Sequence, residues 1–173
     1  MLYARKINSN AWFIGPSLDS DAVSELGTFE HTLSVWKVSD DKQDLDNIAL
    51  ALALTRDKVD EMYIVFLDIE SIKTKYKWNL QLIPQTGNTH YEKMCDYHIN
   101  FKVENFWEQG FLAEHIKILL KDTNNYVYYD VPTLEKLLYE AVKKKDIPRE
   151  EINKIGKWNK SLKKLEEQYG KLS

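Results

Sequence analysis

The sequence predicts an α+β domain, and three consecutive segments in the middle of the chain carry the prediction. Residues 31–38 alternate as a strand does, residues 45–54 form an Ala/Leu-rich helix, and residues 63–67 are an apolar run of strand length. The helix is apolar on nearly all sides, which is typical of a buried helix. We therefore expect a single domain, with this helix packed on a mixed sheet of about five or six strands.

The other elements follow from the same periodicities and from local stop signals. Residues 2–7 form the first expected strand, and Gly15-Pro16 then marks a turn. A short helix over 21–26 follows, with Asp19 or Ser20 as its N-cap. Further strands are expected at residues 78–83, 97–103 and 126–131, and further helices at 70–76, 106–120 and 132–145.

The C-terminal segment 148–173 reads as one amphipathic helix appended to a body formed by residues 1–147. Its apolar positions are three or four residues apart and form a narrow seam: Ile152, Ile155, Trp158, Leu162, Leu165 and Tyr169. Such a seam packs on one neighbouring helix or groove. We expect it to pack on the body or on a protein partner, a second copy of the chain included. In the second case Trp158, Leu162 and Tyr169 are the expected contact residues.

Charge is unevenly distributed along the 173 residues, although the net charge is only −3. Residues 141–173 carry ten Lys or Arg and five Asp or Glu, whereas the rest carries fourteen bases and twenty-two acids. The basic tail can therefore dock on the acidic body through charge complementarity. Contact with nucleic acid is a weaker expectation, because the tail has charges of both signs rather than a pure Lys/Arg run.

The single cysteine and the short apolar runs indicate the compartment. Cys95 has no partner for a disulfide within the chain, which suits a reducing cytosol. The N-terminus has no apolar segment of signal-peptide type, and the longest apolar run, 48–54, is far too short to span a membrane. We expect a cytoplasmic protein without membrane contact, and the Lys/Asn/Ile-rich composition suggests a microbial or phage origin.

Two groups of side chains could bind a metal. His90, Cys95 and His98 carry good zinc ligands on one loop and strand, but their spacing matches no common structural zinc signature, so a surface histidine and a buried cysteine are the more economical interpretation. Asp68 and Glu70 end the central strand and could bind Mg²⁺ or exchange protons. The favoured alternative is that Asp68 caps the short helix that follows.

The first seventy residues resemble the ADP-ribosyltransferase-type fold. The resemblance rests on the Leu2-Tyr-Ala-Arg5 strand, the strand with Leu33-Ser34-Val35, the Ala-rich helix and the apolar strand after it. In that family an early Arg or His, a strand Ser or Tyr and a late Glu handle NAD. The resemblance thus implies roles for Arg5, for Ser34 or His31, and for a carboxylate such as Glu92. The chain departs from the family in lacking a clear Ser-Thr-Ser strand.

Two functions of different classes follow from these observations. The scarcity of catalytic motifs favours an interaction or accessory module that binds another macromolecule. There is no Gly-x-Ser-x-Gly elbow or Gly-rich phosphate loop, and the sequence identifies no cofactor. The alternative is an ADP-ribosyltransferase-like enzyme that handles NAD or a nucleotide. The enzyme requires a cleft in which Arg5, Ser34 or His31, and a carboxylate converge, whereas the module requires an exposed apolar patch on the last helix.

Overall fold

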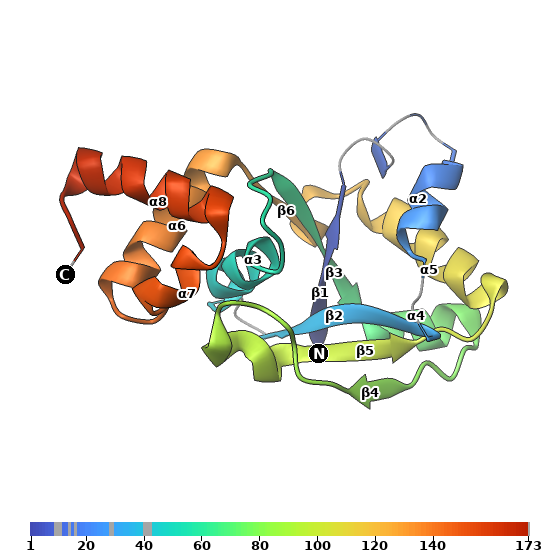
Figure 1. Cartoon of the computed structure of the whole chain (residues 1–173). Coiled ribbons are helices and arrows are strands. Elements are labelled where there is room, and N and C mark those ends of the chain that lie inside the picture. The colour runs from blue at the N-terminus through green and yellow to red at the C-terminus, as the bar shows by residue number, and fades with distance from the viewer. Residues whose placement is uncertain (9–11, 14, 16, 28–29, 40–42, 173) are drawn as a thin grey trace.

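One six-stranded antiparallel sheet, with helices on both of its faces, forms the core of the computed structural model (Figure 1). The structure describes residues 1–8, 12–13, 15, 17–27, 30–39 and 43–172. The strands are β1 (Leu2–Ile7), β2 (Thr32–Val38), β3 (Met62–Asp68), β4 (Leu82–Pro84), β5 (His98–Lys102) and β6 (Tyr126–Tyr129). The helices are α2 (Ser20–Glu25), α3 (Leu45–Ala53), α4 (Ile69–Tyr76), α5 (Phe106–Leu119), α6 (Val131–Lys143), α7 (Arg149–Asn153) and α8 (Gly156–Tyr169), with 3₁₀ turns η1 (Glu92–Tyr97) and η2 (Thr123–Asn125). The expected α+β class is confirmed.

The strand order is β4-β5-β2-β1-β3-β6, and every neighbouring pair is antiparallel. The expected β2-α3-β3 unit is present, but β1 lies between its two strands. Both β2 and β3 therefore pair with β1 rather than with each other. This insertion explains why the sheet is antiparallel throughout and not mixed as expected.

Two expected elements differ from the observed ones by more than two residues. The strand expected over 78–83 is reduced to Leu82–Pro84, and Trp78 packs against the hydrophobic core instead of joining the sheet. The C-terminal helix is divided into α7 and α8, because Ile155 has an extended backbone and becomes the N-cap of α8.

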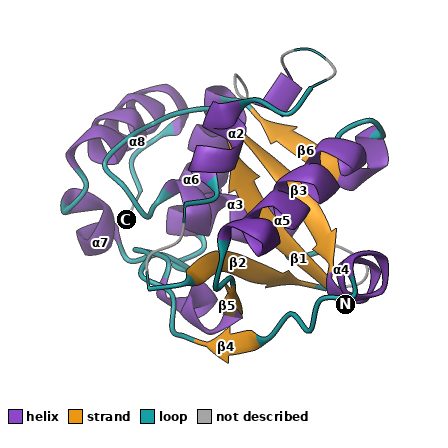
Figure 2. Cartoon of the chain, turned by 90° about the vertical axis from the view of Figure 1, so that its right-hand side faces the viewer, coloured by secondary structure: helices purple, strands orange, loops and turns teal. Residues whose placement is uncertain are grey.

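The two faces of the sheet have separate hydrophobic cores. The first core contains Trp36, Ile64 and Phe66 from the sheet, together with side chains of α3, α6, α7 and α8. The second contains Tyr3, Val35 and side chains of α2, α4 and α5. Figure 2 shows α2 and α5 crossing one face, with α3 and α6 behind the strands. α3 is apolar on nearly all sides because it lies between β2, η1 and α6.

The sheet divides between β1 and β2. Six residue pairs join β1 to β3, whereas only the three pairs from Leu2↔Val38 to Ala4↔Trp36 join β1 to β2. Beyond Ala4 the two strands diverge, and in Figure 1 β2 and β5 run across the direction of β1 and β3. This fork separates β1-β3-β6 from β2-β5-β4 and leaves an opening at the centre of the sheet.

The C-terminal helices pack on the body through residues that the sequence singled out. Trp158 and Leu162 are fully buried in the first core, whereas Tyr169 is 63% exposed. The Trp158 indole N–H donates to the backbone oxygen of Arg56 at 3.2 Å, and the Lys157 backbone N–H donates to the Asp57 carboxylate at 2.6 Å. The start of α8 therefore fixes the loop that follows α3.

None of the helices in the described parts of the chain is both long enough and apolar enough to cross a lipid bilayer.

Replacing Trp158 with alanine tests the packing of α8. Trp158 is completely buried, so Trp158→Ala leaves a cavity and an unpaired carbonyl, and we expect a loss of about 3–5 kcal/mol in the free energy of unfolding. Urea denaturation measures the change. Trp107→Ala is the matched control, because Trp107 is 79% exposed and its removal should cost less than about 0.5 kcal/mol. Equal, near-zero effects of both variants would show that α8 does not stabilise the body.

Candidate functional site

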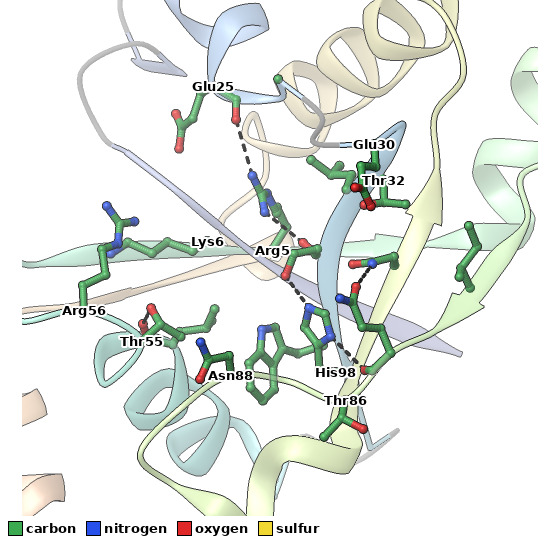
Figure 3. A pocket seen from close by; sticks show the side chains of 18 of the residues that line it. Arg5, Lys6, Glu25, Glu30, Thr32, Thr55, Arg56, Thr86, Asn88 and His98 are labelled. Atoms are coloured by element: carbon green, nitrogen blue, oxygen red, sulfur yellow. Dashed lines mark hydrogen bonds between the residues drawn. The ribbon is translucent and has the colours of Figure 1, made fainter. Parts of the chain in front are cut away.

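A cleft opens at the fork between β1 and β2. Its cavity has a volume of about 900 Å³, within the range of small-molecule sites. It is lined from β1, β2 and β5, from the end of α3 and from the segment after β4 (Figure 3). The residues used below are Arg5, Lys6, Glu25, Glu30, Ser34, Trp36, Arg56, Gln85, His98 and Asn100.

Arg5 lies at the centre of the cleft and makes no ion pair with a described residue. The β1–β2 pairing ends at Ala4; if it continued, Ser34 would lie opposite Lys6. In place of a strand-to-strand hydrogen bond, the Arg5 guanidinium donates to the backbone oxygen of Ser34 at 2.9 Å. It also donates to the backbone oxygen of Glu25 at 3.4 Å, while its buried Nε–H has no partner among the described residues. Burial lowers the pKa of Arg5, and the nearby Arg56 lowers it further against the attraction of Glu25. Both hydrogen-bond acceptors of Arg5 are neutral carbonyls, so no described carboxylate neutralises its positive charge by direct contact.

Lys6 and Arg56 add two more cations on one side of the cavity (Figure 3). Lys6 is half-buried, and burial together with repulsion by Arg56 lowers the pKa of Lys6 to about 8. Asp60 and Glu25 oppose this shift, and Lys58 adds to it. Arg56 is exposed, and its backbone is fixed by Trp158. Neither Lys6 nor Arg56 is within ion-pair distance of a carboxylate in the described ranges.

Glu25 and Glu30 are the only carboxylates among the described residues that line the cavity. Both Glu25 oxygens are already engaged, one with the Asn8 backbone N–H at 2.8 Å and the other with the Trp12 indole N–H at 2.6 Å. Glu30 is exposed and has a left-handed backbone, with φ of 51°. Three cations against two carboxylates make the cleft attractive to an anion.

Ser34 and His98 form a hydrogen-bonded pair on the wall of the cleft. Ser34 Oγ is 2.7 Å from His98 Nε2, and His98 Nδ1 is 2.9 Å from the backbone oxygen of Gln85. The two residues are diagonal neighbours in the β2–β5 ladder, since Ser34 pairs with Asn100 and Trp36 pairs with His98. Both side chains are half-buried and therefore accessible from the cavity.

The segment after β4 holds His98 in this position. Gln85 accepts from His98 through its backbone oxygen and from the Asn100 amide through its side chain. Gly87 packs so closely that a Cβ there would lie 2.9 Å from His98 Cβ and 3.1 Å from the Trp36 ring. The Trp36 ring also meets the imidazole edge to face, with centroids 5.4 Å apart. Gln85, Gly87 and Trp36 thus hold His98 in place.

The structure brings together part of the set that the sequence proposed. Arg5 and Ser34 meet in the cleft, whereas His31 and Glu92 do not line it. His31 is exposed at the turn before β2, and Glu92 is exposed at the start of η1. His98 occupies the cleft instead. Lys6, Arg56 and Gln85 were missed; the charges of Lys6 and Arg56 were visible, but the strand order that gathers them was not.

The candidate metal ligands have separate partners. His90 Nδ1 is 3.2 Å from the Glu151 carboxylate, Cys95 Sγ is 4.0 Å from the Thr89 carbonyl, and His98 faces Ser34. In the portions of the chain that the structure describes, no group of three or more His, Cys, Asp or Glu side chains could hold a metal ion.

Asp68 caps α4, as the favoured interpretation has it. Its carboxylate accepts from the Ser71 hydroxyl at 2.7 Å and from the Ser71 backbone N–H at 3.3 Å. These bonds lower the pKa of Asp68. Glu70 forms a 3.4 Å ion pair with Lys73, one turn along the same helix, so the two carboxylates have different partners.

Comparison with known proteins gives no match: no family model fits the chain, and no curated protein or solved structure matches it.

Proposed function

We propose that this protein is an enzyme that binds NAD or a closely related nucleotide in the cleft between β1 and β2 and acts on it in the manner of ADP-ribosyltransferases. The observation that carries the proposal is the convergence of Arg5, Ser34 and His98, from three different strands, on one cavity. The sequence-based criterion for an enzyme was a cleft that brings together Arg5, Ser34 or His31, and a carboxylate. Arg5 and Ser34 line the cleft, and His98 lies there in place of the expected carboxylate, Glu92. A cytoplasmic location, where NAD is abundant, is part of the same proposal.

The charge and size of the cleft support a phosphate-bearing ligand. Arg5 offers a partly buried guanidinium whose charge no described carboxylate neutralises by direct contact. Arg56 is close enough to lower the pKa of both Arg5 and Lys6. Guanidinium groups bind phosphate oxygens through charge-assisted hydrogen bonds. A cavity of about 900 Å³ has room for a dinucleotide. The amide and hydroxyl groups of its wall, including Asn88 and Thr86, can bind ribose and base.

The resemblance to ADP-ribosyltransferases supports the reaction class, with one departure. Arg5 and Ser34 occupy the cleft as that resemblance implies, but the late carboxylate does not; the corresponding group in the described cleft is His98. The carboxylates that do line it, Glu25 and Glu30, come from an earlier segment. The chemistry proposed here therefore relies on an imidazole rather than on Glu92.

The interaction module expected first from the sequence becomes the second proposal. Of its three contact residues, Trp158 and Leu162 are buried within this chain, and Tyr169 is exposed. Interfaces depend on clusters of buried aromatic anchors rather than on one ring. The exposed ring of Tyr169 is the observation that supports a partner or a second copy at α8, and it supports it less strongly than the cleft supports an enzyme.

Calorimetric titration of the full chain with NAD tests the first proposal. We expect binding that weakens about tenfold in Arg56→Gln and at least tenfold in Arg5→Lys, since each variant removes a guanidinium from the phosphate site. Nicotinamide release, followed by chromatography, reports turnover. Lys163→Gln is the control, because Lys163 is exposed on α8 and should not affect affinity. Absence of both heat and nicotinamide release at millimolar NAD contradicts the proposal.

The Lys6 ammonium should make NAD affinity depend on pH. Its pKa of about 8 means that the side chain is charged below pH 8 and neutral above it. An anionic ligand favours the charged form, so we expect the dissociation constant to rise about tenfold between pH 7 and pH 9. Lys6→Arg keeps a charge across that range and should remove most of the rise. The same pH dependence in wild type and Lys6→Arg would show that another group is responsible.

A further inference from the structure

We propose that Ser34 is a nucleophile and His98 is its general base. The geometry that carries this inference is the chain of two hydrogen bonds from Ser34 through the imidazole to the Gln85 backbone oxygen. The inference rests on the proposed function for the identity of the substrate, and on the hydrogen bonds alone for the activation of Ser34.

The acceptor at one end of the chain determines the direction of both hydrogen bonds. A backbone carbonyl can only accept, so His98 Nδ1 must carry a proton and donate it to Gln85 at 2.9 Å. In the neutral imidazole Nε2 then has a free lone pair. The Ser34 hydroxyl must therefore donate to Nε2 at 2.7 Å, which is the arrangement in which a histidine removes a serine proton. The Gln85 carbonyl takes the orienting role that a carboxylate has in the serine protease triad.

The surroundings hold the imidazole in this orientation before any ligand binds. Gly87 packs beside His98 Cβ and the Trp36 ring, Trp36 meets the imidazole edge to face, and the second hydrogen bond of Gln85, to Asn100, fixes the residue that supplies the carbonyl. Preorganised partners of this kind lower the reorganisation needed during reaction. A histidine in a purely structural role would not need an open cavity beside it, yet both members of the pair line the cleft.

Arg5 supplies the matching charge. Its guanidinium donates to the backbone oxygen of Ser34 itself, so a fixed positive charge lies beside the residue at which negative charge develops as the proton leaves. Partial burial strengthens this interaction relative to water. Arg5 therefore positions the backbone of Ser34, and His98 positions its hydroxyl.

With NAD as substrate, the electrophile is the anomeric carbon that bears nicotinamide. The bond from Ser34 Oγ to that carbon forms as the carbon–nitrogen bond breaks, and nicotinamide leaves as a neutral molecule with the bonding electron pair. The Ser34 proton passes to His98 Nε2. Water then attacks the same carbon, Ser34 Oγ leaves and regains its proton from His98, and the proton of the water is lost to solvent, which restores the free enzyme and yields ADP-ribose.

Labelling of the full chain with diisopropyl phosphofluoridate tests the activation of Ser34 without any nucleotide. In that reaction the Ser34 Oγ–phosphorus bond forms, fluoride leaves with its electron pair, and the proton passes to His98. We expect peptide mass spectrometry to place the label on Ser34. His98→Gln should slow labelling at least about 100-fold, the usual contribution of a general base. Ser24→Ala, which removes an exposed hydroxyl on α2, should label as wild type does.

Nicotinamide release provides the second readout. Ser34→Ala and His98→Gln should each lose it about 100-fold or more while the heat of NAD binding persists. The inference is overturned if wild type carries no label on Ser34, if His98→Gln labels at the wild-type rate, or if Ser34→Ala releases nicotinamide at the wild-type rate. If Ser34 labels in a His98-dependent manner but NAD does not bind, the inference stands and the proposed function fails.

Discussion

The cleft depends on the hydrogen bond from the Arg5 guanidinium to the backbone oxygen of Ser34. A central strand normally pairs with both neighbours along its length, but β1 pairs with β2 at only three positions before the two diverge. Opening a sheet leaves carbonyls without ladder partners, and buried carbonyls need donors. The guanidinium supplies one to the Ser34 carbonyl of β2, which stabilises the gap, and it also donates to the Glu25 carbonyl at the end of α2. The same group leaves a positive charge facing the cavity, so the interaction that permits the fork also prepares it for an anion.

The C-terminal helices contact the loop that carries Arg56, one of the cations of the cleft. Trp158 is buried in the first core and donates to the backbone oxygen of Arg56, while Lys157 contacts Asp57 at the start of α8. Without these contacts, the conformation of the loop after α3 would be fixed only by local hydrogen bonds such as that from Thr55 to the Leu52 carbonyl. Packing of a segment far from the cleft in sequence therefore determines where one of its cations lies. This coupling gives α8 a part in the site, even though Trp158 and Leu162 of its apolar seam face the protein interior.

Local sequence patterns were sufficient to predict most of the helices and strands and the cap of α4, but they were insufficient to predict the site. The helix-capping interpretation of Asp68 was right because a cap depends on residues three positions away. The extent of β4 was overestimated because Trp78 and Leu80 pack against the second core rather than pairing in the sheet. His98 was recognised as chemically interesting, but its partner Ser34 is 64 positions earlier and is brought beside it only by the β2–β5 register. Lys6 and Arg56 were ordinary surface charges until the order of the strands placed them together.

A crystal structure of the full chain with NAD bound tests the central claim most directly. The account predicts density for the pyrophosphate in the fork between β1 and β2, within hydrogen-bond distance of Arg5, with the nicotinamide ribose beside Ser34 and His98. An empty fork, with the nucleotide bound on another surface or not at all under saturating conditions, would contradict it.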